Sequence, residues 1–487
     1  MAATRSTRMD NMDYTDFHLE LTPATIVIFG VTGDLSTRKL LPSLYELEKN
    51  GLLHPKTRII GITRRKFKVA QLLKSSKEGI RDKDGRVVGS TLKSLGKKIE
   101  MYEMNAASAD GYPGLKKYLD EIEAQVGLCM NRLYYLAIPP QVSAPIITHL
   151  GENGLNHGCT KHNTLSHFLL EKPFGFDTTT AEELITVTRK YFAEKQLFRI
   201  DHYLAKETVQ NLVTFRFRNP IFEDIWDSRH IKSISVIADE KLDIEGRANF
   251  YEQVGAMRDL IQSHLLNVVS VVMMNRPKDI TSSDDIHAER QRVLDAIEPV
   301  PANRVLERAI RGQYIGYREE VNNLSSNVET FAALELHSTQ PHWQNVPIYV
   351  RTGKALSKKQ TCIVIEFKPQ ASDHIHTNQL VFYVQPNESI TVQLWVKKPG
   401  FENELQMAPM QFNYQQVFDT HGHPDAYERV LVDAIRGDNT LFATSDEVMA
   451  SWRIIQPVLD YWATTGDDLV RYAKGSDGPD MSSLTAR

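Results

Sequence analysis

A buried strand that runs into a glycine turn and then a helix constrains this fold more than any other part of the sequence. The strand is predicted over residues 25–29, a short apolar run rich in branched side chains. The turn holds Gly30 and Gly33, and the helix is expected to begin near Ser36 or Thr37. In this order of elements the phosphates of a dinucleotide can rest on backbone N–H groups at the start of the helix.

The glycine spacing in this turn differs from the usual dinucleotide-binding pattern. It is G-x-x-G, with Ser36 at the third small position, so a plain tight turn between strand and helix is an alternative. The next predicted strand, residues 58–63, ends in Arg64 and Arg65. An acidic residue at that place would suit NAD, whereas arginine suits the 2′-phosphate of NADP. NADP is therefore the predicted cofactor.

Strands and helices continue to alternate up to about residue 200, which predicts a doubly wound α/β domain with a parallel sheet. Strand-like runs at residues 132–138 and 165–170 and a helical pattern at 115–126 support this prediction. Ligands of such sheets bind beyond the carboxyl ends of the strands, which is where Lys172 falls. A solvated lysine at a strand end is the alternative for Lys172.

The second half of the chain is predicted to be α+β with a mainly antiparallel sheet, because its strand-like segments mostly lack intervening helices. These segments are residues 231–238, 330–336, 346–350, 361–367, 380–384 and 390–396. Two helical patterns, residues 249–274 and 447–463, should pack on one face of this sheet. The sequence therefore predicts a mobile arm over residues 1–24, a Rossmann-like dinucleotide-binding domain over 25–200, and a larger α+β domain for substrate binding and oligomerisation over 201–487.

Charge and composition exclude several classes of partner. Lys plus Arg number 57 against 61 Asp plus Glu, a formal net charge of -4, so no overall positive field favours nucleic acid or an anionic membrane. The most apolar stretch, residues 265–274, is too short to span a bilayer. The three cysteines form no C-x-x-C pair, which favours a reducing compartment such as the cytoplasm and argues against a disulfide framework.

His202 and Lys206 stand four residues apart. On a helix they would share one face and offer two cationic or proton-donating groups to one anion, for which a phosphate-bearing substrate is the natural candidate. The same spacing is common on solvated helix faces, which is the alternative.

A cluster of His157, Cys159, His162 and His167 superficially suggests zinc. The cluster lacks a second cysteine and lies in a predicted loop before a strand, so the metal interpretation is rejected. No metal site is predicted.

Several segments occur together in an order that is typical of one family. They are Gly30-Val31-Thr32-Gly33-Asp34-Leu35, Glu171-Lys172-Pro173-Phe174-Gly175, residues 199–207, Glu245-Gly246-Arg247, Arg258-Asp259, His264-Leu265-Leu266 and Gly353-Lys354-Ala355-Leu356. From about residue 25 to the last predicted helix the chain resembles glucose-6-phosphate dehydrogenases. The resemblance implies NADP-dependent oxidation of glucose 6-phosphate to 6-phosphoglucono-1,5-lactone, the first step of the oxidative pentose phosphate pathway, by a homodimer or homotetramer.

The resemblance also implies roles for individual residues. His264 would be the general base, paired with Asp201, although alone it is more typical of a satisfied helix histidine. The residues implied to bind substrate are Lys172, His202, Tyr203, Lys206, Glu240, Asp259, Lys354 and either Lys358 or Lys359. Those implied to bind cofactor are Gly30, Thr32, Gly33, Asp34, Leu35, Arg64 and Lys172. Pro173 is expected to be a cis proline.

The sequence departs from the family pattern at Ala205, where glycine is usual, at Ser263, where asparagine is usual, and at Ser36, where alanine is common. None of these changes removes a reacting group. The alternatives are a non-catalytic redox sensor that binds dinucleotide, and an enzyme of the same fold that uses another sugar phosphate or NAD. The joint presence of His264 and Asp201 argues against a sensor, which would need no base positioned by an acid.

Overall fold

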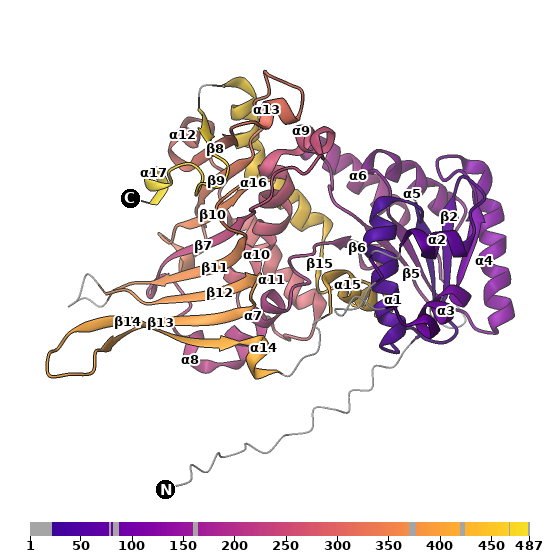
Figure 1. Ribbon diagram of the computed structural model, residues 1–487, viewed down its shortest axis with the longest axis horizontal. Coiled ribbons are helices and arrows are strands. Elements are labelled where there is room, and N and C mark those ends of the chain that lie inside the picture. The colour runs from indigo at the N-terminus through magenta and orange to yellow at the C-terminus, as the bar shows by residue number, and fades with distance from the viewer. Residues whose placement is uncertain are drawn as a thin grey trace, which may run out of the picture.

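The computed structural model describes residues 22–76, 79–80, 87–158, 164–369, 376–418, 424–466 and 468–485. These residues form two sheets, with helices packed around and between them (Figure 1). The predicted arm, residues 1–24, falls almost entirely outside the described residues.

The first sheet has seven strands in the order β15-β6-β5-β4-β1-β2-β3. Its members are β1 (Ala24–Phe29), β2 (Arg58–Thr63), β3 (Ile99–Glu103), β4 (Asn131–Leu136), β5 (Ser166–Leu170), β6 (Leu197–Ile200) and β15 (Phe442–Ala443). All neighbours run parallel except β15, which is antiparallel to β6. Every residue of β1 is buried, which explains its apolar sequence and its central place. The predicted Rossmann-like sheet is confirmed, and its strand order reverses between β1 and β4.

Helices cover both faces of the first sheet. One face shares a core with α1 (Leu41–Lys49), α3 (Gly89–Lys98) and α15 (Ala426–Arg436), and α2 (Val69–Ser75) packs beside α3. The other face is covered by α4 (Tyr112–Val126), α5 (Ser143–Glu152) and α6 (Thr178–Tyr191). Because α15 and β15 come from the C-terminal half, the chain returns to the first sheet, although no local sequence pattern predicts this return. The domain division near residue 200 stays a prediction.

The second sheet has nine strands in the order β14-β13-β12-β11-β7-β10-β9-β8-β16. They are β7 (Ile231–Asp239), β8 (Ala309–Tyr314), β9 (Phe331–Leu336), β10 (Ile348–Gly353), β11 (Gln360–Phe367), β12 (Gln379–Gln385), β13 (Ser389–Lys397), β14 (Leu405–Asn413) and β16 (Leu469–Tyr472). Only β7 with β10 and β8 with β16 run parallel among these described strands. The predicted mainly antiparallel sheet is confirmed.

A layer of helices lies between the second sheet and the first domain (Figure 1). Its members are α7 (Glu207–Arg218), α9 (Ala248–Ala256), the π-helix η5 (Met257–Leu265), α10 (Leu266–Met273), α11 (Ser283–Ala296) and α16 (Ser445–Thr464). Short helices complete this half: α8 (Pro220–Glu223), α12 (Val305–Arg308), α13 (Tyr317–Glu320), α14 (Tyr414–Val417) and α17 (Ser482–Thr485).

The helical pattern predicted over residues 249–274 is divided by a kink at Gly255. This residue has φ 66° and ψ 177°, a conformation that other residues adopt only with strain. A Cβ at Gly255 would lie 2.4 Å from a carboxylate oxygen of Glu329, which accepts a hydrogen bond from the N–H of Met257 at 3.0 Å. The kink therefore lets a buried carboxylate cap the start of η5, the segment that carries Asp259 and His264.

The structure bears on two further expectations, that no segment spans a membrane and that the cysteines form no disulfide framework. Within the described residues, no helix combines the length and the apolar character needed to cross a membrane. Cys129 is disulfide-bonded, which corrects the expectation drawn from the cysteine spacing. Cys362 is a buried free thiol.

Candidate active site

The candidate site is built where the first sheet meets the helix layer. Lys172 follows β5 and Asp201 follows β6, so both lie beyond the carboxyl ends of neighbouring parallel strands. Asp259 and His264 come from η5, where both are buried. The order of the strands brings Lys172 and Asp201 to one edge of the sheet, and the packing of η5 against that edge adds Asp259 and His264.

The second sheet contributes two more residues from the ends of parallel strands. Glu240 follows β7 and Lys354 follows β10, and these strands pair with Asp239 opposite Gly353. Glu240 and Lys354, which come directly after this pair, therefore lie side by side. The Lys354 ammonium forms an ion pair with the Glu240 carboxylate.

His264 and Asp201 form a buried pair. Nδ1 of His264 lies 2.7 Å from Oδ1 of Asp201, and the two side chains are 4% and 2% exposed. The backbone N–H of Tyr203 donates to the same oxygen at 2.8 Å, and the amide of Asn267 donates to Oδ2 at 2.6 Å. Because both carboxylate oxygens accept hydrogen bonds, the carboxylate is held in one orientation as the anion.

The surroundings favour a neutral His264 and an ionised Asp201. Burial lowers the pKa of His264, and the positive charge of Lys172 adds to this effect against the opposing charge of Asp201. Burial alone would raise the pKa of Asp201, but His264 and the amide of Asn267 hold it below its ordinary value. With Asp201 ionised, Nδ1 of His264 carries the shared proton, so the lone pair of Nε2 can accept another.

A row of alternating ammonium and carboxylate groups lies beside the pair formed by His264 and Asp201. The Lys172 ammonium donates to the backbone carbonyl of Asp259 at 2.8 Å and to its carboxylate at 3.1 Å. The other carboxylate oxygen of Asp259 lies 3.7 Å from the Lys354 ammonium. Burial alone would raise the pKa of Asp259, but Lys172 and Lys354 outweigh it and lower this pKa. Ammonium and carboxylate groups in this arrangement suit a ligand with several hydroxyls.

Residues 202–206 form a turn, which corrects the expectation of a helical face. Helix α7 begins only at Glu207, with Lys206 at its N-cap position. His202 and Lys206 are therefore not brought together by helical periodicity. The ring of Tyr203 stacks on that of His264, with centroids 4.6 Å apart. The half-buried Lys206 ammonium has no hydrogen bond or ion pair with a described residue.

His202 packs against residues of the first domain and α15. Its Nε2 lies 3.7 Å from a carboxylate oxygen of Glu171, beyond hydrogen-bond distance, and the Tyr427 ring lies with its centroid 4.1 Å from the imidazole. Both ring nitrogens are buried and lack a hydrogen-bond partner in the described part of the chain. Buried polar atoms are normally paired, so this histidine is well suited to bind a polar ligand.

A cleft of about 440 Å³ lies at the carboxyl ends of β1 to β4. Its lining includes the predicted cofactor residues Gly30, Thr32, Gly33 and Arg64. Gly30 has φ +80°, and a Cβ there would lie 2.4 Å from the carbonyl oxygen of Ala137, so glycine is needed at this turn. Asp34, Leu35 and Lys172 are outside the lining of this cleft.

A second cleft, of about 290 Å³, opens at the start of β11. Lys358 and Lys359 both line it and both are exposed, so the geometry does not choose between them as a ligand-binding residue. Thr361, further along the same strand, lies beside Tyr203.

Only some of the residues that superficially suggest zinc lie in the described part of the chain. His167 is buried, and its Nδ1 lies 2.7 Å from the carbonyl oxygen of Ala434, which is a structural contact between β5 and α15. Cys159 and His162 lie outside the described residues. In the described ranges there is no group of three or more His, Cys, Asp or Glu side chains that could hold a metal ion.

Two family models together match most of the chain. The model for the glucose-6-phosphate dehydrogenase NAD binding domain matches residues 27–211, and that for the C-terminal domain matches residues 213–487. The chain belongs to the glucose-6-phosphate dehydrogenase family. Glucose-6-phosphate 1-dehydrogenase of Rhizobium meliloti is 35% identical over 480 residues, covering 94% of this chain and 95% of that protein. The protein of the same name from Borreliella burgdorferi is 36% identical over 472 residues, covering 93% and 95%.

Solved structures of glucose-6-phosphate dehydrogenases have the same fold. One, in complex with its substrate glucose-6-phosphate, matches with a TM-score of 0.88 and 32% identity, covering 96% of this chain and 98% of that chain. The enzyme from Mycobacterium avium matches with a TM-score of 0.81 and 29% identity, covering 96% and 97%. The Lys172–Pro173 bond is cis, which confirms the expectation from the family resemblance.

The departures from the glucose-6-phosphate dehydrogenase pattern leave the site intact. Ala205 is buried and is not among the described non-glycine residues with positive φ, so its methyl group causes no backbone strain of that kind. The hydroxyl of Ser36 donates to the carbonyl of Gly30 at 3.0 Å and so supports the turn. The hydroxyl of Ser263 donates to the carbonyl of Asp259 at 3.3 Å.

Sequence reasoning missed two residues that touch the site. Asn267 donates to Asp201, and its position three residues after His264 was a signal that both could share a helix face. Tyr427, which packs on His202, comes from α15. Its place follows from the return of the chain to the first sheet, and no local pattern indicates it.

Proposed function

We propose that this chain oxidises C1 of glucose 6-phosphate to 6-phosphoglucono-1,5-lactone, with hydride transfer to NADP. The buried pair of His264 and Asp201 beside Lys172 is the observation that carries the proposal. Similarity over nearly the whole chain to proteins named glucose-6-phosphate 1-dehydrogenase supports it. A redox sensor would have no need of a buried base held by an acid.

His264 is the general base of the proposed reaction. Its Nε2 takes the proton of the C1 hydroxyl while Nδ1 donates to Asp201, whose negative charge stabilises the imidazolium that forms. When bound, NADP accepts the hydride that leaves C1. Loss of the hydroxyl proton together with that hydride converts the C1 hydroxyl to the carbonyl of the lactone.

The remaining polar residues hold the sugar phosphate. His202 and Lys206 bind the phosphate, with Tyr203 beside them, because their side chains are cationic or proton-donating and lack full hydrogen bonding. Glu240 and Asp259 accept hydrogen bonds from sugar hydroxyls. Lys354 and either Lys358 or Lys359 would complete the substrate pocket, and Lys172 would lie between the sugar and the nicotinamide.

Replacing Lys206 by alanine is expected to raise KM for glucose 6-phosphate by roughly 10- to 100-fold, the effect of losing one charge-assisted hydrogen bond. The effect on kcat should be smaller, because the base is untouched. Steady-state kinetics checks this, with Lys195→Ala as the control for an exposed lysine far from the site. An unchanged KM would exclude phosphate binding by Lys206.

The first cleft fits the phosphates and 2′-phosphate of NADP. The backbone at Gly30 turns away from β1, and the N–H of Gly33 donates to the Gly30 carbonyl at 2.9 Å, so the turn is narrow and free of side chains at Gly30 and Gly33. Thr32 also lines this cleft, and Asp34 and Leu35 follow it into the helix start. Exposed Arg64 lies at the end of β2, where a guanidinium can pair with a phosphate.

Replacing Arg64 by alanine is expected to raise KM for NADP by about 10-fold or more and to leave KM for NAD nearly unchanged. The reason is that only NADP carries the 2′-phosphate. Arg65→Ala is the matched control, because Arg65 is the exposed neighbour outside the cleft lining. Equal effects of Arg64→Ala on both cofactors would show that Arg64 does not bind the 2′-phosphate.

The activity itself is tested by following NADPH absorbance when the purified chain is mixed with glucose 6-phosphate and NADP. Other sugar phosphates, and NAD in place of NADP, distinguish enzymes of the same fold with another preference. No turnover with any of these pairs over a range of pH, with and without magnesium, would refute the dehydrogenase proposal.

The quaternary state is proposed to be a homodimer or homotetramer. Strand β14 is an edge of the second sheet and exposes Leu405 and Met410, at 47% and 61%. An exposed apolar edge strand is a natural surface for pairing with a second copy of the chain. Light scattering during size-exclusion chromatography should give about two or four times the chain mass of 55.4 kDa; a monomer would contradict this.

A cytoplasmic location is also proposed. Its support is the chemistry of the ligands, since glucose 6-phosphate and NADP are charged and do not cross a bilayer unaided. The cysteines no longer support it, because Cys129 is disulfide-bonded. Fractionation of cells that express the tagged chain would test the location.

A further inference from the structure

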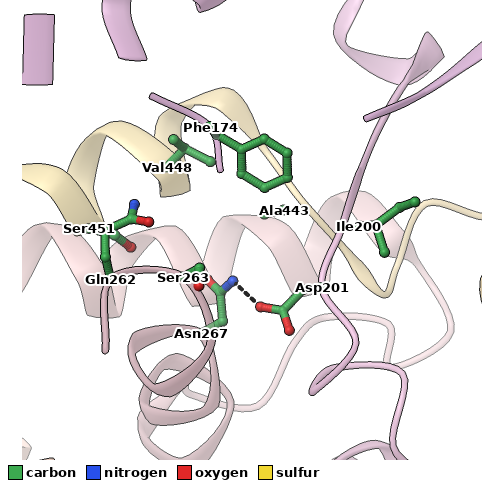
Figure 2. A pocket seen from close by; sticks show the side chains of 9 residues that line it. All are labelled: Phe174, Ile200, Asp201, Gln262, Ser263, Asn267, Ala443, Val448 and Ser451. Carbon is green, nitrogen blue, oxygen red and sulfur yellow. Dashed lines mark hydrogen bonds between the residues drawn. The ribbon is translucent and has the colours of Figure 1, made fainter. Parts of the chain in front are cut away.

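Two side chains of one helical segment bond to the two oxygens of the Asp201 carboxylate. Nδ1 of His264 lies 2.7 Å from Oδ1, and the Asn267 amide donates to Oδ2 at 2.6 Å, the bond drawn in Figure 2. The backbone stays helical through Leu265 and Leu266, where η5 passes into α10. The histidine and the asparagine are three residues apart, so they lie on the same face of this segment. One element therefore holds both ends of the carboxylate.

Asn267 is the single donor to Oδ2 in the part of the chain that the structure describes. Oδ1, in contrast, also accepts from the backbone N–H of Tyr203 at 2.8 Å and from that of Leu204 at 3.4 Å. Asp201 is 2% exposed and Asn267 is 5% exposed. Without this amide a buried, charged oxygen would be left unpaired, which strongly disfavours the anion.

The chemistry of the carboxylate fixes which end of the Asn267 amide faces it. An ionised carboxylate only accepts hydrogen bonds, so the amide nitrogen lies against Oδ2 and the amide oxygen points away. Donation to the charged form of an acid stabilises that form. Asp201 is thereby kept from taking the proton that Nδ1 of His264 carries, and Nε2 keeps the lone pair that a base needs.

We propose that Asn267 is a positioning residue of the oxidation, which fixes the charge and the orientation of Asp201 and through them the tautomer of His264. This assignment rests on the proposed function, because it requires His264 to act as the base. Asn267 acts only through Asp201 and takes no part in proton or hydride transfer itself.

The charged and titratable side chains that face the pair of His264 and Asp201 come from the ends of β5 and β6 and from η5. They are Lys172, His202, Tyr203 and Asp259. The residues that β15 and α16 place around the cavity beside Asp201 and Asn267 are uncharged, namely Ala443, Val448 and Ser451. Because a neutral substitution of Asn267 changes none of these charges, its effect on the pair reports the lost hydrogen bond.

An exchange of the two partner side chains tests the proposal most sharply. In Asp201→Asn the new amide faces either His264 or the donating Asn267, and neither orientation keeps both hydrogen bonds. With Asn267→Asp in addition, the amide oxygen at position 201 can accept from Nδ1 while its nitrogen donates to the carboxylate at position 267. The double variant is therefore expected to recover about tenfold or more of the kcat that Asp201→Asn loses, because the tautomer of His264 is restored.

The matched control for this exchange is Asp201→Asn combined with Asn267→Leu. It removes the opposing donor without supplying an acceptor, so it should recover less kcat than the exchange. Equal kcat in the two double variants, or an exchange no faster than Asp201→Asn alone, would overturn the proposal. Circular dichroism and thermal melting show whether each variant is folded, and Asn267→Leu alone tests the proposal where a double variant is not.

Asn267→Leu keeps the volume of the side chain and removes the donor. The Asp201 anion is then less stabilised, so the pair takes up a proton more readily. The acidic limb of the pH profile, where kcat/KM rises with pH, should therefore move to higher pH. On the plateau, kcat should fall by about 3- to 10-fold, the effect of one lost hydrogen bond, with little change in KM for glucose 6-phosphate.

The control for Asn267→Leu is Asn156→Leu, which changes a buried asparagine that donates to the carbonyl of Tyr191 in the first domain. It should leave the acidic limb in place. An acidic limb of Asn267→Leu that also stays in place, or that moves to lower pH, would show that Asn267 only fills space beside Asp201.

Neutron diffraction from crystals of the full-length chain tests the contact without any activity. Deuterons are expected on Nδ1 of His264 and on the Asn267 nitrogen that faces Oδ2. A deuteron on Asp201, or an Asn267 oxygen facing it, would overturn the proposal. If the expected deuterons are found in a chain that does not oxidise glucose 6-phosphate, the proposed function fails while the assigned hydrogen bonds stand.

Discussion

Replacing His264 by alanine is expected to lower kcat for glucose 6-phosphate oxidation by about 10³-fold, within the range for loss of a general base. The C1 hydroxyl is then deprotonated only by water, whereas binding of the sugar phosphate depends on other side chains. KM should therefore change much less than kcat. Steady-state kinetics of the purified variant measures both, and calorimetric titration with glucose 6-phosphate shows whether the pocket still binds.

The control for this change is His342→Ala, a half-buried histidine that contacts Trp343 and no proposed site residue. It should keep kcat within about twofold, as expected for a change away from the site. His264→Ala also leaves Asp201 without one of its hydrogen-bond donors, so its fold must be checked by circular dichroism. If kcat of a folded His264→Ala falls less than about tenfold, His264 is not the base.

Features set by local sequence were predictable. The apolar run before Gly30 indicated a central strand because full burial on both faces demands such a sequence, and the structure places it there as β1. Arg64 and Gly30 line one cleft because the carboxyl ends of neighbouring parallel strands meet at one edge of a sheet. The order of strands and helices was enough to infer both kinds of sheet.

Features set by long-range packing were not predictable from spacing. His264 and Asp201 touch only because η5 packs against the end of β6, and the resemblance, not any periodicity, indicated their contact. The pairing of β15 with β6 depends on the chain returning from the far end. The turn at residues 202–206 replaced an expected helix, since the Asp201 carboxylate bonds to the N–H of Tyr203 and holds a tight turn there.

Replacing Asp201 by asparagine is expected to lower kcat by about 10²- to 10⁴-fold while leaving the shape of the site nearly unchanged. The neutral amide no longer stabilises the imidazolium of His264. An amide also has one donor end, which would face either Nδ1 of His264 or the donating amide of Asn267. If the amide nitrogen faces His264, Nδ1 can only accept, so the proton of the imidazole lies on Nε2, which then has no lone pair for the substrate, and the Tyr203 N–H loses its acceptor. If it faces Asn267, two donors meet and that hydrogen bond is lost.

The pH dependence of kcat/KM distinguishes loss of the Asp201 charge from a simple loss of packing. His264 acts as a base only when neutral, so kcat/KM rises with pH through the pKa of its imidazole in the free enzyme. Burial and Lys172 lower this pKa, and the charge of Asp201 opposes them. Without that charge the pKa of His264 falls further, so in Asp201→Asn the acidic limb of the profile, where kcat/KM rises with pH, should move to lower pH.

The control is Asp433→Asn, which changes a buried carboxylate paired with Arg429 on α15 and should leave the acidic limb in place. A limb that stays in place, or moves to higher pH, in Asp201→Asn would mean that the Asp201 charge does not act on His264.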